Sequence, residues 1–308
     1  MSFSMVIDWL QATLRWSAPL LLVSIGEVFA ERSGIINMGI EGIMLSGALC
    51  GVAISFFTGS VLMATLVTML LGATMGMVVA FLTVSRRTNQ VVTGLMLNML
   101  AMGGTNLLFA LLSASRQTRV AMFPVLFPES MYKIPVIGPI LFQQPVTTWI
   151  ALVLPIFSAI VLYKTAWGLN VRAVGDNPQA AATAGLYVIR IKYQTVILSG
   201  IFAALGGCVL TLAGAGYFAS GGMTAGRGFI VLAAVVVGGW NPVKTALICL
   251  VFGAADAAQL RFQAMGSVVP YQFLQMLPYL ITVIALTVMV KYSRVPKTWG
   301  AAYDQRDV

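Results

Sequence analysis

Long apolar segments follow one another along almost the whole chain, and only short polar breaks separate them. Residues 61–84 and 91–112, for example, each reach the length of about 20 residues that crosses the hydrocarbon layer of a membrane. Only 9% of the 308 residues are charged, whereas a soluble domain carries about 25%. We therefore expect an all-α polytopic membrane protein with about eight to ten transmembrane helices, forming a single transmembrane domain over residues 1–308.

The basic residues gather at the ends of these apolar segments. The chain has 18 Lys and Arg against 9 Asp and Glu, a net charge of +9, and such clusters mark cytoplasmic loops rather than a nucleic-acid surface. They predict a cytoplasmic turn at 86–87, a cytoplasmic loop over 164–192 and a cytoplasmic tail over 291–308. The proline-containing interval 113–146 is then an external loop. Counting back along the chain, the polar break at 31–34 falls inside and the N-terminus outside.

Cysteine and histidine usage excludes several kinds of site. Cys50, Cys208 and Cys249 all lie inside apolar segments without a Cys-x-x-Cys pair, so packing residues are expected rather than a disulfide. No histidine occurs, which excludes histidine-based metal sites and a histidine general base. No Gly-Lys pair occurs either, so the chain lacks a Walker A loop for ATP. We expect no metal, no cofactor and no enzymatic activity in this chain.

A polar stretch at 173–186 interrupts the apolar pattern inside the basic loop. Asn177 can cap a helix, Pro178 suits its first position, and Gly185 can end it in a left-handed conformation. The residues between them predict a helix over 178–184, about two turns and about 10 Å long. A helix this short is marginal in water. It therefore either covers the ends of the membrane helices or docks between them and another protein.

The sequence of this stretch resembles a known element. The run Gly-Asp-Asn-Pro-x-Ala-Ala-x-x-x-Gly, followed by a basic residue and a Leu-Ser-Gly segment, is similar to the cytoplasmic coupling loop of permease subunits of ABC importers. In those importers the short helix sits in a groove of the ATPase and transmits its closure. The residues to which the resemblance gives this role are Gly175, Asp176, Asn177, Pro178, Ala181, Ala182 and Gly185.

Two further blocks resemble the simple-sugar and nucleoside branch of these permeases, near the ribose and branched-chain amino acid permeases. Residues 31–42 are similar to the N-terminal block of that branch, and residues 228–242 are similar to its C-terminal block. With its run Glu-Arg-Ser-Gly-Ile-Ile-Asn-Met-Gly-Ile-Glu-Gly, the chain looks most like the second permease of nucleoside importers fed by basic-membrane-protein lipoproteins.

The resemblance implies a membrane-spanning permease subunit of an ATP-driven importer in the bacterial cytoplasmic (inner) membrane. It implies a nucleoside as substrate, with a simple sugar such as ribose as the alternative. The implied partners are a cytoplasmic ATPase that binds ATP and Mg, a second homologous permease that completes a heterodimer, and an external or lipid-anchored substrate-binding protein. The rival from another class is a stand-alone, ion-coupled secondary transporter, which leaves the short cytoplasmic helix without a purpose. A membrane-embedded enzyme lacks the necessary paired acids with His or Cys.

Polar side chains inside the apolar segments are candidates for the substrate pathway, because a charge near the bilayer centre costs about 2.5–3.5 kcal/mol and is usually functional. Glu41 should lie within the hydrocarbon layer; its rival role is a brace that caps a broken helix around Gly39 and Gly42. Asn98 and Asn106 suit ribose hydroxyls or base edges, although bonds between helices explain them as well. The candidate pathway residues are Glu27, Asn37, Glu41, Asn98, Asn106 and Asp256.

Two acidic residues lie close to the first polar break. Glu27 and Glu31 are four residues apart and share a helix face, where like charges repel. Arg32 lies one residue beyond Glu31, off this face, and must find another partner. The alternative is that Glu31 and Arg32 lie in the cytoplasmic turn and need no site. Farther along the chain, Tyr217, Phe218 and the pair 221–222 are candidates for an external gate.

Overall fold

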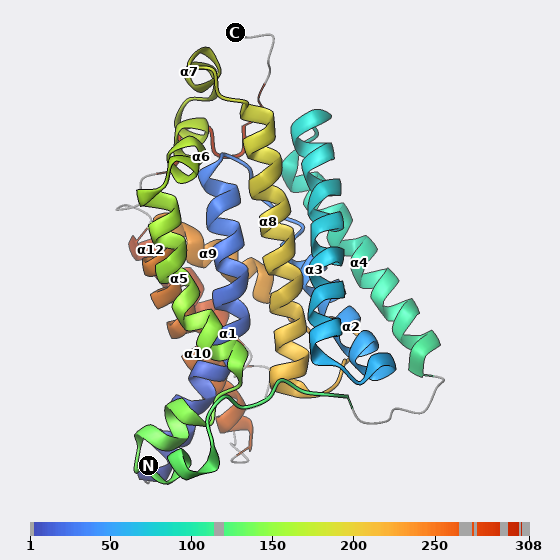
Figure 1. Cartoon of the computed structure of the whole chain (residues 1–308), viewed down its shortest axis with the longest axis vertical. Coiled ribbons are helices and arrows are strands. Elements are labelled where there is room, and N and C mark those ends of the chain that lie inside the picture. The colour runs from blue at the N-terminus through green and yellow to red at the C-terminus, as the bar shows by residue number, and fades with distance from the viewer. Residues whose placement is uncertain are drawn as a thin grey trace.

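The computed structural model describes residues 3–113, 120–264, 273, 276–289, 295–301 and 303. Helices make up nearly all the regular structure of these residues (Figure 1), and the β-bridge among them, between Val125 and Pro145, is isolated. The α-helices are α1 (Phe3–Arg32), α2 (Ile40–Thr58), α3 (Val61–Ala80), α4 (Gln90–Ser113), α5 (Val146–Lys164), α6 (Ala166–Asp176), α7 (Pro178–Thr183), α8 (Val188–Val209), α9 (Arg227–Val237), α10 (Pro242–Ala264) and α12 (Leu277–Met289). Shorter π- or 3-10-helical segments are η1 (Phe81–Ser85), η2 (Glu129–Lys133), η3 (Gly138–Phe142) and η4 (Leu210–Ala215).

Six helical segments in the described residues are long and apolar enough to cross a membrane. α1 is longer still, with 30 residues and a length of about 45 Å, and two shorter apolar helices lie within α9 and α12. The expected all-α, multi-pass membrane architecture is confirmed, whereas a total of eight to ten spans stays a prediction. The six segments are Ile40–Thr58, Val61–Ser85, Gln90–Leu112, Val146–Lys164, Val188–Ala215 and Pro242–Gln263.

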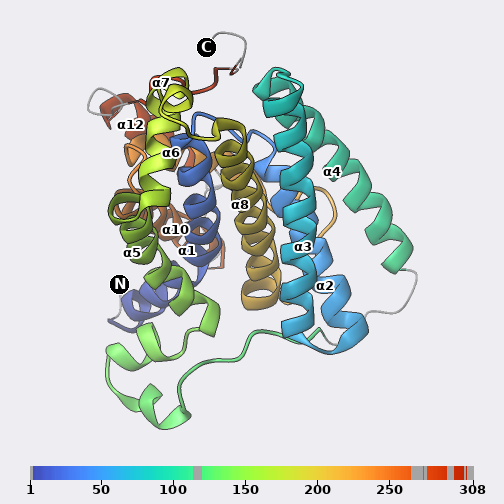
Figure 2. The same cartoon turned by 45° about the horizontal axis from the view of Figure 1, so that its top comes forward.

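α8 lies in the middle of the bundle and packs against α1, α2 and α3 (Figures 1 and 2). α3 and α8 touch through their backbones, because a Cβ atom on Gly200 would lie only 2.4 Å from the carbonyl oxygen of Gly72. α2 approaches α8 equally closely, since a Cβ atom on Gly47 would lie 2.2 Å from the carbonyl oxygen of Ala204. Small residues allow this close packing between helices in lipid, so the glycines determine how near α2 and α3 come to the central helix.

Large apolar side chains cover the outward faces of α3, α4 and α5. On α4, Met96, Met99 and Leu100 are 66%, 76% and 73% exposed. α4 packs chiefly against α2 and stands apart from the remaining helices (Figure 2). Exposed apolar surface of this extent is covered by lipid or by another protein in native surroundings, as expected for a membrane-embedded bundle.

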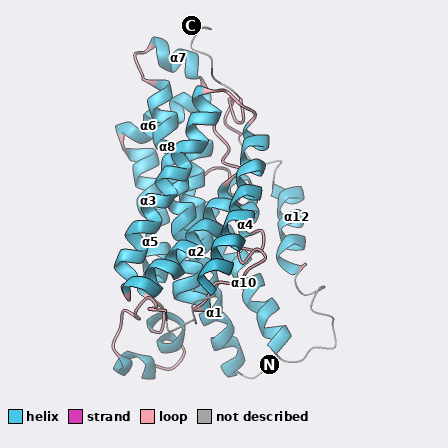
Figure 3. Ribbon diagram, turned by 90° about the vertical axis from the view of Figure 1, so that its right-hand side faces the viewer, coloured by secondary structure: helices cyan, strands magenta, loops and turns pink. Residues whose placement is uncertain are grey.

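The two ends of the bundle carry different parts of the chain. α7 and the tail residues 295–301 lie at one end, and the start of α1 lies at the other (Figures 1 and 3). The break after α1 and the turn between α9 and α10 meet at the α7 end, where Trp240 donates to Glu31. The end of η1 also lies there, since Ser85 bonds Tyr193 near the start of α8. The segments expected on one side of the membrane therefore share one end, opposite the start of α1; residues 114–119, 291–294, 302 and 304–308 of the expected loop and tail lie outside the described residues.

The end of α1 distinguishes between the two alternatives for Glu31 and Arg32. The helix continues through Arg32, and Glu31 is fully buried instead of lying free in a polar turn. The Trp240 Nε1–H donates to Glu31 Oε2 at 2.6 Å, and the Arg32 Nε–H donates to the carbonyl oxygen of Trp240 at 3.2 Å. The alternative in which Glu31 lies in a polar turn and needs no site is wrong, because a buried carboxylate must find donors inside the protein. Arg32 finds another partner, as its place off the face of Glu27 and Glu31 led us to expect.

Candidate functional site

α7 has the boundaries that its capping residues predict. The Asn177 Oδ1 accepts from the backbone N–H of Ala180 at 3.0 Å, and Pro178 occupies the first helical position. Gly185 follows the last turn with a left-handed φ of +85°, and its N–H donates to the carbonyl oxygen of Ala182. The helix ends at Thr183, one residue earlier than expected, as the last turn tightens toward the glycine.

The two faces of α7 have different surroundings. Pro178 and Ala181 are buried against the bundle, whereas Gln179, Ala180 and Thr183 are exposed. Small side chains therefore make most of the outward surface. Such a surface allows the backbone of a partner to approach closely, so this face is the one available for docking.

α6 precedes α7 and was missed in the sequence. Thr165 caps it by accepting from the backbone N–H of Gly168 at 3.1 Å, and Val171 and Val174 form its buried side. Asp176 is its last residue and is exposed, while Gly175 is buried against the end of α1. The cap and the spacing of the valines are signals that could have revealed this helix. α6 thus fixes the start of α7 relative to α1.

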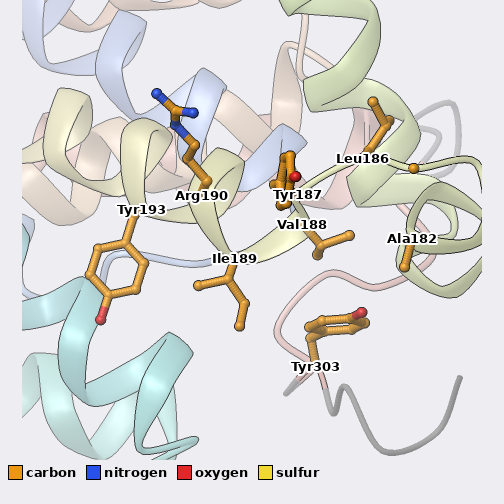
Figure 4. A pocket seen from close by; sticks show the side chains of 9 residues that line it. Ala182, Leu186, Tyr187, Val188, Ile189, Arg190, Tyr193 and Tyr303 are labelled. Carbon is orange, nitrogen blue, oxygen red and sulfur yellow. The ribbon is translucent and has the colours of Figure 1, made fainter.

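A pocket of about 840 Å³ opens beside α7, between this helix, the start of α8 and the C-terminal tail (Figure 4). Tyr303 of the tail lies near Ala182 and Val188 at its wall. Apolar and aromatic side chains supply most of the lining, with Arg190 as its cation. The lining residues are Ala182, Gly185, Leu186, Tyr187, Val188, Ile189, Arg190, Tyr193 and Tyr303.

Glu27 and Asn37 meet inside the bundle, together with Ser199 of α8. The Glu27 Oε1 accepts from the backbone N–H of Asn37 at 3.0 Å, and its Oε2 accepts from the Ser199 hydroxyl at 2.7 Å. The Asn37 Nδ2–H donates to the same hydroxyl at 3.0 Å. Ser199 is 11 residues past Val188, the first residue of α8, or about 16 Å along its axis. The non-helical segment before α2 is therefore held deep within the bundle.

Asn98 of α4 caps the start of α2. Its Oδ1 accepts from the backbone N–H of Gly42 at 2.7 Å, and its Nδ2–H donates to the carbonyl oxygen of Met38 at 2.8 Å. Gly39 finds its acceptor in the Asn37 Oδ1 at 3.2 Å. Asparagine side chains thus bond the amides of Gly39, which precedes α2, and of Gly42 in its first turn, while the amide of Ile40 bonds the backbone carbonyl of Asn37.

Glu41 holds the start of α9 rather than the start of its own helix. Its Oε1 accepts from the backbone N–H of Gly226 at 2.8 Å and from the Thr224 hydroxyl at 2.5 Å. Its Oε2 accepts from the backbone N–H of Gly228 at 2.7 Å. A carboxylate suits the positive end of a helix. Glu41 therefore has the geometry of a brace, but the broken helix that it caps is α9.

Asp256 and Asn106 also find partners in the chain. The carboxylate of Asp256 forms an ion pair of 3.0 Å with Arg227, the first residue of α9, and the guanidinium lies 5.5 Å from the ring centroid of Trp16. The sequence pointed to Asp256 but missed Arg227, although a cation inside an apolar block is itself a signal. The Asn106 Oδ1 accepts from the backbone N–H of Gly221 at 3.0 Å.

The six candidate pathway residues thus fall into separate groups. Glu41 and Asp256 meet at the start of α9, Glu27 pairs with Asn37, and Asn98 and Asn106 reach out from α4. The candidate gate residues have different surroundings. Phe218 is buried, with its ring centroid 5.1 Å from that of Phe109, whereas Tyr217 is exposed.

No metal cluster appears in the part of the chain that the structure describes. No three His, Cys, Asp or Glu residues there come close enough to hold an ion. Cys50, Cys208 and Cys249 are free thiols. The candidate site residues in the described part of the chain act as helix caps or form an ion pair.

Three relatives show which proteins this sequence is similar to. Guanosine ABC transporter permease protein NupQ of Bacillus subtilis (strain 168) is 36% identical over 313 residues, 95% of each chain. Nucleoside ABC transporter permease protein NupC of Lactococcus lactis subsp. cremoris (strain MG1363) is 37% identical over 300 residues, 94% of each chain. TsgC13 of Haloferax volcanii, which carries the name of a glucose ABC transporter permease, is 36% identical over 261 residues, 83% of this chain and 78% of its own. No solved structure matches the chain.

A family model gives the same assignment over most of the chain. The model, described as the permease component of the branched-chain amino acid transport system, matches residues 10–290. The matched range runs from α1 to the end of α12 and includes α7 and every candidate pathway residue. The chain therefore belongs to the family of branched-chain amino acid transport system permease components.

Proposed function

We propose that this chain is the membrane-spanning permease subunit of an ATP-driven importer that carries a nucleoside across the bacterial cytoplasmic membrane. The observation that carries the proposal is the similarity to NupQ and NupC, at 36% and 37% identity over 95% and 94% of this chain. The relatives bear the names of guanosine and nucleoside transporter permeases. Similarity over the full length supports a shared role, because it includes both the membrane helices and α7.

α7 is the element through which the ATPase acts in this proposal. Asn177 and Gly185 fix its ends, Pro178 and Ala181 fasten it to the bundle, and the exposed alanine-rich side faces the partner. ATP and Mg bind to that partner, and this chain supplies no group to them. Closure of the ATPase moves α7, and α6 carries the movement to the end of α1. The residues assigned to coupling are Gly175, Asp176, Asn177, Pro178, Ala181, Ala182 and Gly185.

The substrate pathway runs past the starts of α2 and α9, which both lie inside the bundle. Broken helices with their amino ends near the bilayer midplane form substrate sites in many transporters. The carboxylates of Glu41 and Asp256 can accept from nucleoside hydroxyls, and Asn98 can both donate and accept. Opening of the pathway then requires the caps to exchange partners. The proposed pathway residues are Glu27, Asn37, Glu41, Asn98, Asn106 and Asp256.

The complete importer requires three kinds of partner. A cytoplasmic ATPase docks on α7, and a second homologous permease completes a heterodimer around the pathway. An external or lipid-anchored binding protein delivers the substrate at the opposite end. The large exposed apolar surface of the described helices is compatible with both lipid and a second permease.

A simple sugar is the second candidate substrate, and the name of TsgC13 as a glucose permease favours it. Sugars and nucleosides share hydroxyl groups, which amide and carboxylate side chains bind alike. A nucleoside remains the first choice because the relatives with nucleoside names cover more of this chain, 95% and 94% against 83%.

Uptake into right-side-out vesicles, whose interior corresponds to the cytoplasm, tests the proposal. The chain is expressed alone and together with its ATPase, sister permease and binding protein, and labelled guanosine, ribose and glucose are supplied in parallel. We expect guanosine uptake only with the complete set and only with ATP inside. Uptake of a sugar without guanosine would move the substrate to the second candidate. Uptake by the chain alone, driven by an ion gradient, would overturn the importer and support a secondary transporter.

A further inference from the structure

The tail of the chain returns to the α7 end after α12. We call residues 295–301 the C-terminal strap. The strap lies across the end of α1, at the same end of the bundle as α7 (Figures 1 and 3). Lys297 is exposed, whereas the neighbouring Thr298 is partly buried and bonded to the bundle. The strap is thus docked on the bundle through hydrogen bonds.

At one side the strap bonds the end of α6. The backbone N–H and the hydroxyl of Thr298 both donate to the carbonyl oxygen of Gly175, at 3.2 and 2.6 Å. Gly175 comes two residues before Asn177, the cap of α7. Gly175 also touches α1 directly, because a Cβ atom there would lie 1.9 Å from the carbonyl oxygen of Arg32. This direct contact resists compression but cannot pull, whereas hydrogen bonds resist separation.

At its other side the strap bonds α1 and the segment that follows it. The Trp299 Nε1–H donates to Glu31 Oε2 at 2.9 Å, and the backbone N–H of Gly300 donates to the carbonyl oxygen of Gly34 at 3.1 Å. Trp240 donates to the same carboxylate oxygen, and its ring lies 5.9 Å from that of Trp299 at 75°. The strap therefore supplies one of the two N–H groups that Glu31 receives among the described residues.

The close approach of Thr298 to Gly34 requires a glycine at position 34. Its φ is +91°, and a Cβ atom on it would lie 2.8 Å from the Thr298 hydroxyl oxygen.

Beyond the strap, the ring of Tyr303 lies 5.8 Å from the ammonium of Lys192 on α8. Lys192 is 1% exposed, and its ammonium makes no hydrogen bond within the described residues. The tail thus covers a buried cation as well as a buried carboxylate.

We propose that the C-terminal strap is a tensile link that carries the movement of α7 to α1, with Thr298 and Trp299 as positioning residues. The inference rests on the proposed function, since it concerns how α7 drives transport. The link runs from Gly175 through the strap to Glu31. Glu31 is one turn from Glu27, which holds Asn37 and Ser199 inside the bundle. Retraction of α7 therefore pulls on the segment before α2.

Two substitutions remove single bonds of the strap, and two matched ones serve as controls. Thr298→Val removes the hydroxyl donor to Gly175, and Trp299→Phe removes the indole donor to Glu31 while keeping an aromatic ring. Thr147→Val and Trp149→Phe delete the same groups where they bond no described residue. Losing the bond to the neutral carbonyl of Gly175 should lower the equilibrium constant for docking about two- to tenfold, and losing the bond to the Glu31 carboxylate should lower it at least about tenfold.

Hydrogen exchange of the purified chain tests the docking without any transport assay. We expect slow exchange in the strap of the parent chain and of both controls. Exchange should be about two- to tenfold faster in Thr298→Val and at least about tenfold faster in Trp299→Phe. Asn177→Ala, which removes the α7 cap, should speed exchange of residues 35–39 in the parent but not in the Thr298→Val, Trp299→Phe double variant. Unprotected strap amides in the parent, or an equal effect of Asn177→Ala in both backgrounds, would overturn the link.

Transport in the complete importer supplies the second readout. The double variant should retain ATP hydrolysis and ATPase binding but import about tenfold less guanosine per ATP. An unchanged ratio of guanosine to ATP overturns the link. Absence of ATP-driven uptake in the parent complex would instead defeat the proposed function, and the exchange experiment alone would then decide on the strap.

Discussion

At the scale of single residues, Gly185 sets the end of α7. Its φ of +85° is closed to proline, and its N–H donates to Ala182. We predict that Gly185→Pro lowers ATP-dependent guanosine uptake at least about tenfold, since a misplaced proline costs about 3 kcal/mol, and weakens co-purification with the ATPase. Gly185→Asn is the control, because asparagine tolerates a left-handed backbone. Equal uptake by the two variants would show that this helix end does not matter.

Glu27, which is buried, and Glu41, which is half-buried, should respond differently to neutralisation. Glu41 accepts from two backbone N–H groups, which cannot reverse their direction. Glu41→Gln therefore points an amide N–H at a donor and should lower the free energy of unfolding by about 1.5–3 kcal/mol. Glu27→Gln should cost about 1 kcal/mol or less, because the Ser199 hydroxyl can accept instead of donate. Thermal unfolding in detergent measures both, and an equal loss would contradict the assigned bonds.

The sequence singled out Glu27, Asn37, Glu41, Asn98, Asn106 and Asp256 as polar residues in apolar segments, but it did not indicate their hydrogen-bond partners. Glu41 stands out in an apolar segment by its cost alone. Its three donors come from residues more than 180 positions away in the chain, and no local pattern indicates them. The same holds for Glu31, whose donors are Trp240 and Trp299. A local sequence pattern cannot indicate hydrogen-bond partners that lie far apart in the chain and that only the fold brings close together.

At the scale of helices, the contact between α3 and α8 depends on bare backbone. A Cβ atom on Gly200 would lie 2.4 Å from the carbonyl oxygen of Gly72, whereas one on Gly103 of α4 would meet nothing within 4 Å. Gly200→Ala should therefore lower the free energy of unfolding by about 1–3 kcal/mol through overpacking. Gly103→Ala should leave stability unchanged or raise it by about 0.5–1 kcal/mol. Chemical denaturation of the two variants measures the contrast; a harmless Gly200→Ala would mean that the helices are not in contact there.

Helix boundaries followed from local chemistry where the chain supplies caps. Asn177, Pro178 and Gly185 predicted α7 to within one residue. α6 was missed because its cap at Thr165 and its buried Val171 and Val174 lie inside a basic loop, where the charge pattern predicts only the side of the membrane. Caps act within one turn, so elements that carry them are readable from sequence. The packing of α6 against α1, in contrast, depends on the tertiary structure.

At the scale of the whole molecule, the arrangement of the ends predicts a topology. Thr58, at the end of α2, lies with the N-terminal end, and Gln179 of α7 lies at the opposite end (Figure 1). In whole cells, a membrane-impermeant thiol reagent should label Thr58→Cys but label Gln179→Cys only after the membrane is opened. The parent chain gives the background from Cys50, Cys208 and Cys249, which are buried or half-buried. Labelling of Gln179→Cys from outside would invert the topology.

The sequence by itself determined that this protein is a helical membrane bundle and predicted the capped helix α7 to within one residue. Hydropathy, charge at segment ends and helix caps are local properties, and each acts over a few residues. Only the tertiary structure decided that Glu41 braces α9, that Asn98 caps α2 and that the C-terminal strap joins Gly175 to Glu31. Those contacts arise because buried polar groups must pair within the protein, and the fold determines which distant residues lie near enough to pair.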